Sequence, residues 1–262
     1  MILTSKSAII TGAGSGIGRR IALKLAEQGA VIVVADIDPK SAEDTVSEIE
    51  KAGHKAIAVR TDVSDKRQVI EMKDRALKEY GKIDILVNDA GVMSPPSPIE
   101  DLPEEEWDRV MAVNVKGVFL SSQVVAKEMI HQKEGCIINI ASISGHGPYP
   151  MGGAYSSSKG AILVLTQQLA LEWGKHHIRV NSISPGMIRT PLNEKVFAVK
   201  EIYEGRKNLV PLHRVGDPED IANVAVFLAS DNASFITGID ITVDGGFMTV
   251  LQGLIPGRAG GK

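Results

Sequence analysis

Tyr155 and Lys159 stand four residues apart at the start of a long stretch with helical apolar spacing. On a helix, residues at this spacing lie on the same face, so the phenol and the ammonium group share one local field. A phenol with its ordinary pKa of about 10 is a poor proton acceptor at neutral pH, and a nearby cation lowers that pKa. The pair therefore predicts proton transfer to or from an alcohol or a carbonyl. Taken alone, it also fits an ordinary surface Tyr and Lys at a helix start.

A glycine-rich turn joins a short apolar stretch to a helical one. Its pattern is GxxxGxG, formed by Gly12, Gly16 and Gly18, and Ser15 and Ile17 stand between these glycines. Ile17 breaks the commoner GxGxxG register. Glycines allow backbone N–H groups to approach a pyrophosphate, and the start of a helix adds a favourable dipole. The turn predicts a dinucleotide site, and a tight structural turn is the alternative.

Asp36 supports the nucleotide interpretation. It ends the second expected strand, 24 residues after Gly12, where a carboxylate can hold both hydroxyls of the adenosine ribose. A 2′-phosphate at this point would meet a negative charge, and Ser15 in the glycine turn offers no basic group to neutralise it. These residues predict NAD as the cofactor rather than NADP. For Asp36 alone, a solvated carboxylate at a strand end is the alternative.

Two further strand ends supply small or acidic residues. Asp62 and Val63 end the third expected strand, where they would flank an adenine ring. Asn88, Ala90 and Gly91 follow the fourth strand, and small side chains there leave room for a cofactor that lies across the strand ends. By itself, the second group would be interpreted as a β-turn.

Short unbroken apolar runs, typical of parallel strands buried on both faces, alternate with longer runs of helical spacing. This order predicts right-handed βαβ units and one Rossmann-like α/β domain, a doubly wound parallel sheet of about seven strands with helices on both faces. We expect the domain to span residues 1–252, with a substrate lid at 187–212, and a Gly-rich tail to follow at 253–262. Strands are expected near residues 7–11, 30–35, 56–60, 83–87, 136–141, 178–183 and 239–243, and long helices at 104–130 and 155–175.

The composition excludes several classes of protein. The 262 residues carry a net charge of −3 with no basic cluster, which argues against nucleic acid or a membrane surface as a partner. No apolar stretch approaches the ~20 residues of a membrane span. Cys136 is the single cysteine, which rules out an internal disulfide and fits a reducing compartment. We therefore expect a cytoplasmic protein, and no spacing of His, Cys or carboxylate residues predicts a metal site.

Assembled in order, these motifs resemble those of the classical short-chain dehydrogenase/reductase family. The likeness covers nearly the whole chain, and its motifs are weak singly but specific together. They are the TGxxxGxG turn, Asp62-Val63, the NxAG turn after the fourth strand, Asn114, Ser142, Tyr155-x-x-x-Lys159 and Pro185-Gly186.

The resemblance implies a role for each polar residue. The family residue that matches Tyr155 is the general acid/base, and the one that matches Lys159 binds the nicotinamide ribose and lowers the pKa of the tyrosine. The match to Ser142 hydrogen-bonds the substrate oxygen, and the match to Asn114 holds a water in a proton relay. The segment that packs the nicotinamide is matched by Pro185, Gly186, Ile188 and Thr190.

One position departs from the family pattern. The turn after the fourth strand is usually Asn-Asn-Ala-Gly, and its second Asn is replaced by Asp89 here. A carboxylate that faced the cofactor would put nicotinamide binding in doubt. We expect Asp89 instead to face solvent or to accept hydrogen bonds from backbone N–H groups, so that little changes.

The substrate is poorly specified by the sequence. We expect its walls to come from residues 143–153 and from the lid, with Ser142 and Tyr155 at the reacting oxygen. Each of the other candidates also fits a purely structural role. These candidates are His146, Tyr149, Met151 and Met187.

The expected function is hydride transfer between NAD(H) and a secondary alcohol or ketone, with Tyr155 as the general acid/base. An NADPH-dependent 3-oxoacyl-acyl-carrier-protein reductase is the close alternative, and Asp36 and Ser15 argue against it. A non-catalytic dinucleotide sensor and a purely structural subunit are more distant alternatives, which leave the catalytic set unexplained. The resemblance also implies a homotetramer, in which the tail at 254–258 could reach a neighbour's pocket.

Overall fold

The computed structural model describes residues 1–254 of the chain. Seven parallel strands form one sheet in the order β3-β2-β1-β4-β5-β6-β7. The sequence order reverses between β1 and β4, and ligands of open α/β sheets bind at such a switch point, outside the carboxyl ends of the strands. The strands are β1 (Ser7–Thr11), β2 (Val31–Asp36), β3 (Ala56–Arg60), β4 (Ile85–Asn88), β5 (Gly135–Ile140), β6 (Ile178–Pro185) and β7 (Asp240–Val243).

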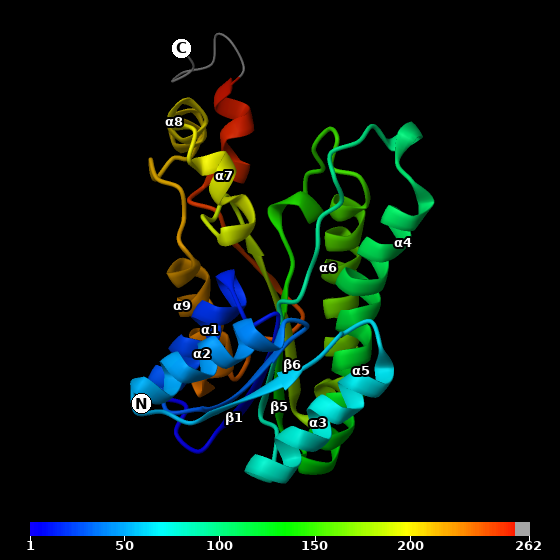
Figure 1. Ribbon diagram of the computed structural model, residues 1–262, viewed down its shortest axis with the longest axis vertical. Helices are drawn as coiled ribbons and strands as arrows, with labels where there is room; N and C mark the ends of the chain where they lie inside the picture. The colour runs from blue at the N-terminus through cyan, green and yellow to red at the C-terminus, as the bar shows by residue number, and fades with distance from the viewer. Residues whose placement is uncertain (255–262) are drawn as a thin grey trace.

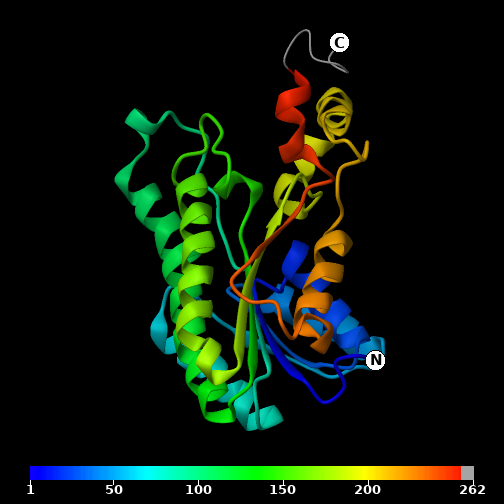
Figure 2. The ribbon, with the colours of Figure 1, turned by 180° about the vertical axis from the view of Figure 1, so that it is seen from behind.

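Helices cover both faces of this sheet (Figures 1 and 2). One face carries α1 (Gly16–Glu27), α2 (Pro39–Lys51) and α9 (Pro218–Ala229). The other face carries α3 (Lys66–Tyr80), α4 (Glu104–Met111), α5 (Gly117–Gln132) and α6 (Ala154–Trp173). The arrangement confirms the predicted single Rossmann-like domain with a doubly wound parallel sheet.

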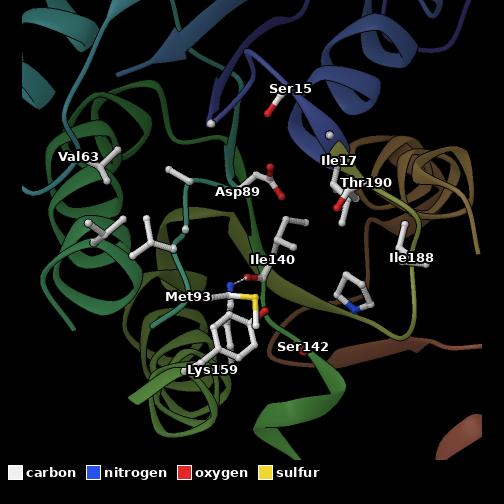
Figure 3. Close-up of a pocket in the computed structure, with 18 of the residues that line it drawn as sticks. Ser15, Ile17, Val63, Asp89, Met93, Ile140, Ser142, Lys159, Ile188 and Thr190 are labelled. Carbon is white, nitrogen blue, oxygen red and sulfur yellow. Dashed lines mark hydrogen bonds between the residues drawn. The ribbon is translucent and has the colours of Figure 1, made fainter. Parts of the chain in front are cut away.

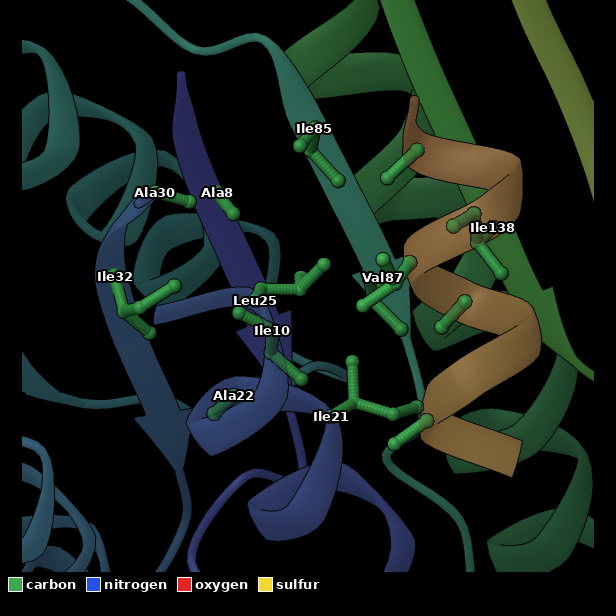
Figure 4. Packing of buried hydrophobic residues seen from close by; sticks show 14 of the residues in the cluster. Ala8, Ile10, Ile21, Ala22, Leu25, Ala30, Ile32, Ile85, Val87 and Ile138 are labelled. Atoms are coloured by element: carbon green, nitrogen blue, oxygen red, sulfur yellow. The ribbon is translucent and has the colours of Figure 1, made fainter. Parts of the chain in front are cut away.

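Alternation along each strand sends apolar side chains to both faces of the sheet. Ala8 and Ile10 of β1 belong to the core cluster beneath α1 and α9, whereas Ile9 between them belongs to the cluster beneath α3, α5 and α6. Figure 4 shows the first cluster, in which Ile21 and Leu25, one turn apart on α1, lie over the sheet. Burial on both faces explains why the strand sequences are apolar without interruption.

The stretch expected to be helical over residues 104–130 is helical throughout and contains one wide turn. α4 passes into a π-helical turn, η2 (Ala112–Lys116), and α5 follows it. The prediction of a long helical stretch is therefore confirmed, although apolar spacing did not reveal the single wide turn inside it. The turn contains Asn114, and π-helical turns are frequent at functional sites.

The segment predicted as a substrate lid, residues 187–212, leaves the sheet after β6. It contains η5 (Pro191–Asn193), α7 (Glu194–Phe197) and α8 (Lys200–Leu209), and its start pairs with Gly216, whose carbonyl accepts a hydrogen bond of 2.9 Å from the Arg189 N–H. After β7, η7 (Phe247–Leu254) lies beside α7 and α8 at the same end of the molecule. The domain bounds and the lid stay predictions, and residues 255–262 of the predicted tail lie outside the described residues.

Two kinds of feature are absent from the described part of the chain. Within residues 1–254, no helix is both long and apolar enough to cross a membrane. In the same residues, no group of three or more His, Cys, Asp or Glu side chains is placed to hold a metal ion. Cys136 is buried on β5 as a free thiol, where its Sγ contacts the Leu228 carbonyl at 3.3 Å.

Candidate active site

A cleft of about 430 Å³ lies across the carboxyl ends of the strands, at the switch point between β1 and β4 (Figure 3). The glycine turn after β1 forms one wall and the segment after β6 forms another. Most of the residues predicted for the site lie along this cleft. They are Gly12, Ser15, Gly16, Ile17, Asp36, Asp62, Val63, Ala90, Gly91, Ser142, Tyr155, Lys159, Pro185, Gly186, Ile188 and Thr190.

Tyr155 and Lys159 are presented by the first turns of α6. The helix begins at Ala154, directly after Gly153, whose φ of 53° is strained for any residue with a Cβ. A Cβ at Gly153 would also collide with the Ser94 side chain. This tight entry fixes the start of α6 and hence the direction of the phenol. Lys159 follows one turn later and points into the same cleft.

Ser142 reaches the cleft from the end of the neighbouring strand β5. Its side chain is buried, and its hydroxyl caps the short helix η3 (Ile143–Gly145) by accepting a hydrogen bond of 3.1 Å from the Ser144 N–H. Ser142 lies near enough to the Tyr155 phenol to lower its pKa, which favours the phenolate. The serine and the tyrosine are therefore close enough to share one substrate oxygen.

Lys159 does not reach the phenol oxygen. Its Nζ lies 5.7 Å from the centroid of the Tyr155 ring and donates a hydrogen bond of 2.7 Å to the Ile140 carbonyl (Figure 3). Burial raises the pKa of Tyr155 to about 12, and the neighbouring Ser142 hydroxyl only partly opposes the rise. Burial lowers the pKa of Lys159, and the charge of Asp89 opposes that fall. Burial therefore dominates the phenol pKa of the protein alone, and the lowering of that pKa by Lys159 stays a prediction.

Asn114 lies behind this group rather than in the cleft wall. Its Oδ1 accepts a hydrogen bond of 2.8 Å from the Val92 N–H, and its Nδ2 donates to the Val92 carbonyl and to the Ser158 hydroxyl, each at 3.0 Å. These contacts use both N–H donors of the amide and one lone pair of Oδ1. The role implied for Asn114, holding a water, stays a prediction.

The glycine turn has the conformation that the predicted dinucleotide site needs. Gly12 and Gly16 have φ values of 69° and 57°, and α1 begins at Gly16, so the last part of the motif forms its first turn. A Cβ on Gly12 would lie 2.8 Å from the Ala90 backbone. Gly18 is buried and does not line the cleft, and a Cβ there would lie 2.5 Å from the Gly12 carbonyl oxygen. Glycines at these positions therefore allow the backbone of the turn to pack closely at the start of α1.

Asp36 is held in place by the same turn. Its Oδ2 accepts a hydrogen bond of 2.9 Å from the Gly14 N–H, and its Oδ1 accepts one of 3.0 Å from the Asp38 N–H. A Cβ on Gly14 would lie 2.9 Å from Oδ2, so this glycine allows the carboxylate to approach the turn. Each oxygen retains a lone pair for a ligand hydroxyl.

Asn88 lies buried in the sheet and Asp89 lines the cleft, which is the reverse of what the sequence predicted. Asn88 is buried in the sheet, where its Nδ2 donates to Ser122 Oγ at 3.0 Å and to Asn139 Oδ1 at 2.8 Å. It ties β4 to α5 and β5 and does not line the cleft, although the sequence predicted a cofactor residue there. Asp89 lines the cleft instead.

The Asp89 carboxylate lies beside the Gly18 backbone at the start of α1, where the N–H of this glycine favours its charged form. Burial raises the pKa of Asp89 to about 7, and the charge of Asp36 adds to the rise, whereas Lys159 and the Gly18 N–H oppose it. The expected hydrogen bond to a backbone N–H stays a prediction. The expectation that Asp89 would stay clear of the cofactor side is wrong, because Asp89 lines the cleft and the missing Cβ of Gly18 leaves room for its carboxylate there.

The four other substrate candidates lie outside the residues that line the cleft. Tyr149 and Met151 are exposed on the loop before α6. His146 is held by Asp240 of β7, with 2.9 Å between its Nε2 and the carboxylate Oδ2. Met187 lines a separate cavity of about 320 Å³ behind the start of the lid segment. Their predicted contact with substrate stays a prediction.

Sequence reasoning missed several residues of the cleft. Most of them stand one or two positions from a predicted residue. Ile37, for example, directly follows Asp36. Its side chain is 58% exposed, and an exposed apolar residue at a strand end indicates a ligand surface. Met93 comes from the loop after β4, where no motif marked it. The missed residues are Ile37, Thr61, Asp89, Val92, Met93, Val113, Ile140, Ala141, Pro191 and Asn193.

The residues present fit a dinucleotide. At one end, the glycine turn and the start of α1 suit a pyrophosphate, and the fixed Asp36 carboxylate suits a ribose diol. Val63 and Ile37 offer apolar surface beside it for a base. At the other end, Lys159 can donate to a second ribose while Tyr155 and Ser142 face a reacting oxygen.

Comparisons with known proteins agree with this site. A family model described as enoyl-(acyl carrier protein) reductase matches residues 12–248. An NAD-dependent glycerol dehydrogenase of Listeria innocua is 41% identical over 245 residues, which cover 94% of this chain and 94% of that protein. A 3-oxoacyl-acyl-carrier-protein reductase of Thermotoga maritima is 38% identical over 248 residues, covering 95% of this chain and 100% of that protein.

Solved structures show the same likeness in three dimensions. The gluconate 5-dehydrogenase of Burkholderia cenocepacia, in complex with NADP and tartrate, superposes with a TM-score of 0.89 at 34% identity, covering 94% of this chain and 96% of that chain. The chain belongs to the classical short-chain dehydrogenase/reductase family. It is therefore an oxidoreductase of small molecules that uses a nicotinamide dinucleotide.

Proposed function

We propose that the protein is an NAD-dependent dehydrogenase that oxidises a secondary alcohol to a ketone and catalyses the reverse reduction. One observation carries the proposal. A single cleft joins the fixed Asp36 carboxylate at one end to Tyr155 and Ser142 at the other. The first end suits the adenosine ribose, and the second suits proton transfer to a substrate oxygen.

Asp36 favours NAD over NADP. Its carboxylate would accept hydrogen bonds from both ribose hydroxyls, and it would repel a phosphate at the 2′ position. Among the described residues that line the cleft, Lys159 is the only basic one, and it belongs to the other end. The relatives divide on this point, since one is named for NAD and one solved structure contains NADP.

The chain's own residues divide the chemical work. Ser142 would donate a hydrogen bond to the substrate oxygen and orient it toward Tyr155. The Tyr155 phenolate would accept the hydroxyl proton during oxidation, and the phenol would return it during reduction. Lys159 would hold the nicotinamide ribose and stabilise the phenolate. The oxidised nicotinamide, when bound, supplies the acceptor for the hydride.

A 3-oxoacyl-acyl-carrier-protein reductase remains the second candidate, because a relative with 38% identity carries that name. The absence of a basic partner for a 2′-phosphate in the described cleft wall disfavours it. A non-catalytic dinucleotide sensor is disfavoured by the shared cleft of Ser142, Tyr155 and Lys159, which such a sensor would not need.

Initial rates with a panel of substrates test the proposal. Absorbance of the reduced cofactor would be followed with secondary alcohols and polyols, glycerol and gluconate included, and with NAD or NADP as cofactor. We expect oxidation of at least one alcohol, with NAD preferred. Turnover limited to an acyl-carrier substrate and NADPH would favour the second candidate, and binding of NADH without any turnover would favour a sensor.

The expected homotetramer and cytoplasmic location belong to the same proposal. Large apolar side chains are exposed on the outer faces of two helices, with Phe119 on α5 and Val164 and Leu171 on α6. These faces are the ones through which the expected tetramer would form. The single, buried Cys136 fits a reducing compartment. Light scattering during size-exclusion chromatography would measure the oligomeric mass.

A further inference from the structure

Asp89 is placed where its charge matters for the cofactor. It follows β4 and turns its carboxylate toward the first turn of α1, where it lies beside the Gly18 backbone and the N–H of Gly18 favours its charge. A Cβ on Gly18 would lie 2.6 Å from Asp89 Oδ2, so the missing side chain of this glycine makes room for the carboxylate. Figure 3 shows Asp89 beside the glycine turn that carries Ser15 and Ile17.

The same helix start is the part of the cleft that suits a pyrophosphate. Backbone N–H groups at a helix N-terminus and the aligned helix dipole attract one anion there. Ser15, Gly16 and Ile17 line the cleft on this side together with Asp89. A bound dinucleotide would therefore bring its pyrophosphate close to the Asp89 carboxylate, and two negative groups would lie at the start of α1.

We propose that Asp89 lowers the affinity for the dinucleotide: its ionised carboxylate competes with the pyrophosphate for the positive end of α1, and its protonation removes the competition. The inference rests on dinucleotide binding in this cleft. It does not depend on whether the cofactor is NAD or NADP. An Asn at this position would accept the Gly18 hydrogen bond without the charge.

The groups that face Asp89 set the pH at which the competition changes. They are the Gly18 N–H on α1, Lys159 and Tyr155 on α6, and Asp36 at the end of β2. Burial raises the pKa of Asp89 to about 7, so its charge changes near neutral pH.

The sign of the pH dependence follows from linkage. A bound pyrophosphate adds a negative charge beside Asp89 and raises this pKa further. Dinucleotide binding is then accompanied by proton uptake, and the affinity falls as the pH rises through about 7.

Fluorescence titration with NADH tests the inference. Dissociation constants would be measured between about pH 6 and pH 8.5 for the wild type and for Asp89→Asn. We expect the wild-type dissociation constant to rise about tenfold across this range, the effect of one unit of pKa shift on binding. Asp89→Asn should bind more tightly at the alkaline end and should show little slope.

A matched control and a second ligand make the test specific. Asp44→Asn removes the same charge from an exposed position on α2 and should keep the wild-type slope. ADP-ribose has the pyrophosphate but no nicotinamide, so its affinity should show the same pH dependence as that of NADH. Equal slopes for wild type and Asp89→Asn, or a wild-type affinity that does not change with pH, would overturn the inference while leaving the proposed function intact. No NADH binding at any pH would overturn both.

Thermal unfolding without cofactor gives an independent measurement. Because the native pKa of Asp89 is raised above its unfolded value, the native state binds more protons between about pH 4 and pH 7, and stability falls as the pH rises through that window. The melting temperature of Asp89→Asn should fall less over this range than that of the wild type. Parallel pH dependence for the two proteins would contradict the desolvated carboxylate on which the inference stands.

Discussion

The ammonium group of Lys159 lies 5.7 Å from the centre of the Tyr155 ring but donates its hydrogen bond to the Ile140 carbonyl, at 2.7 Å. Lys159 can therefore act on the Tyr155 phenol through its charge rather than through a hydrogen bond. Burial sets the phenol pKa high in the protein alone, at about 12. Proton transfer at moderate pH then needs additional stabilisation of the phenolate, which a bound cofactor and the Ser142 hydroxyl are placed to contribute.

The pH profile of alcohol oxidation should reveal this relationship. Because Tyr155 must lose its proton to act as a base, kcat should rise with pH and then level off. Replacing Lys159 with Met removes the charge, so the midpoint of the rise should move to higher pH by about one unit or more. Steady-state rates across a pH series measure both midpoints. Identical midpoints for the two proteins would show that Lys159 does not act on the phenol.

Cofactor choice should depend on Asp36. Asp36→Ala removes the acceptor for the ribose hydroxyls and the charge that repels a 2′-phosphate. We expect kcat/KM for NAD to fall about 10- to 100-fold, as for the loss of a hydrogen bond to a charged group, while kcat/KM for NADP rises. Asp44→Ala, an exposed change on α2, serves as the control. An unchanged ratio of NAD to NADP in Asp36→Ala would refute the ribose argument.

The packing of η3 against α6 should be sensitive to one methyl group. A Cβ on Gly145 would lie 2.8 Å from the backbone of Lys159, so Gly145→Ala must push Ser142 and α6 apart. We expect a loss of about 1–3 kcal/mol in stability, typical of overpacking, together with lower kcat. Chemical denaturation and steady-state kinetics measure these effects.

Gly174→Ala provides the matched control for this substitution. Nothing lies within 4 Å of a Cβ built on Gly174, which is exposed at the end of α6. This variant should keep wild-type activity and stability, or gain up to about 1 kcal/mol. Equal behaviour of the two variants would mean that the η3 contact does not position Ser142.

His146 should act by fixing the loop that follows Ser142. Asp240 binds the imidazole at 2.9 Å and also accepts hydrogen bonds from Ser182 and Ser184 on β6, at 2.6 and 2.9 Å. His146→Ala frees the loop, and because the pair is partly exposed we expect a cost of about 1 kcal/mol or less. KM for the alcohol should rise several-fold while the NADH dissociation constant stays unchanged.

A conservative variant separates positioning from substrate contact at this residue. His146→Gln retains a donor for Asp240 and should restore most of KM if His146 only positions the loop. A failure of Gln to restore KM, with the melting temperature restored, would instead support the predicted contact with substrate.

The sequence was sufficient to predict the fold and the cleft because both depend on local patterns. Apolar strands buried on both faces and a glycine turn before a helix leave signatures in consecutive residues, and Asp36 stands where the second strand ends. Tyr155 and Lys159 needed only helical spacing. These features are set by short-range geometry, so their positions in the chain determine their positions in space.

Other features depend on contacts that no spacing reveals. Asn88 and Asp89 are adjacent, and only the sheet decides that the first is buried against Asn139 and the second enters the cleft. The phenol pKa depends on burial, and several segments of the chain contribute the atoms that bury the phenol. His146 meets a carboxylate far along the chain, so its role as a loop contact could not be distinguished from a substrate contact.

The central claim is that Tyr155 transfers the substrate proton in a dehydrogenase that binds NAD(H). The most direct test compares Tyr155→Phe with the wild type in two measurements, alcohol oxidation and the NADH dissociation constant. The account predicts that Tyr155→Phe loses oxidation by at least about 100-fold, the lower range for general acid–base catalysis, and keeps NADH binding within about threefold. Near-normal turnover by a folded Tyr155→Phe protein would contradict it.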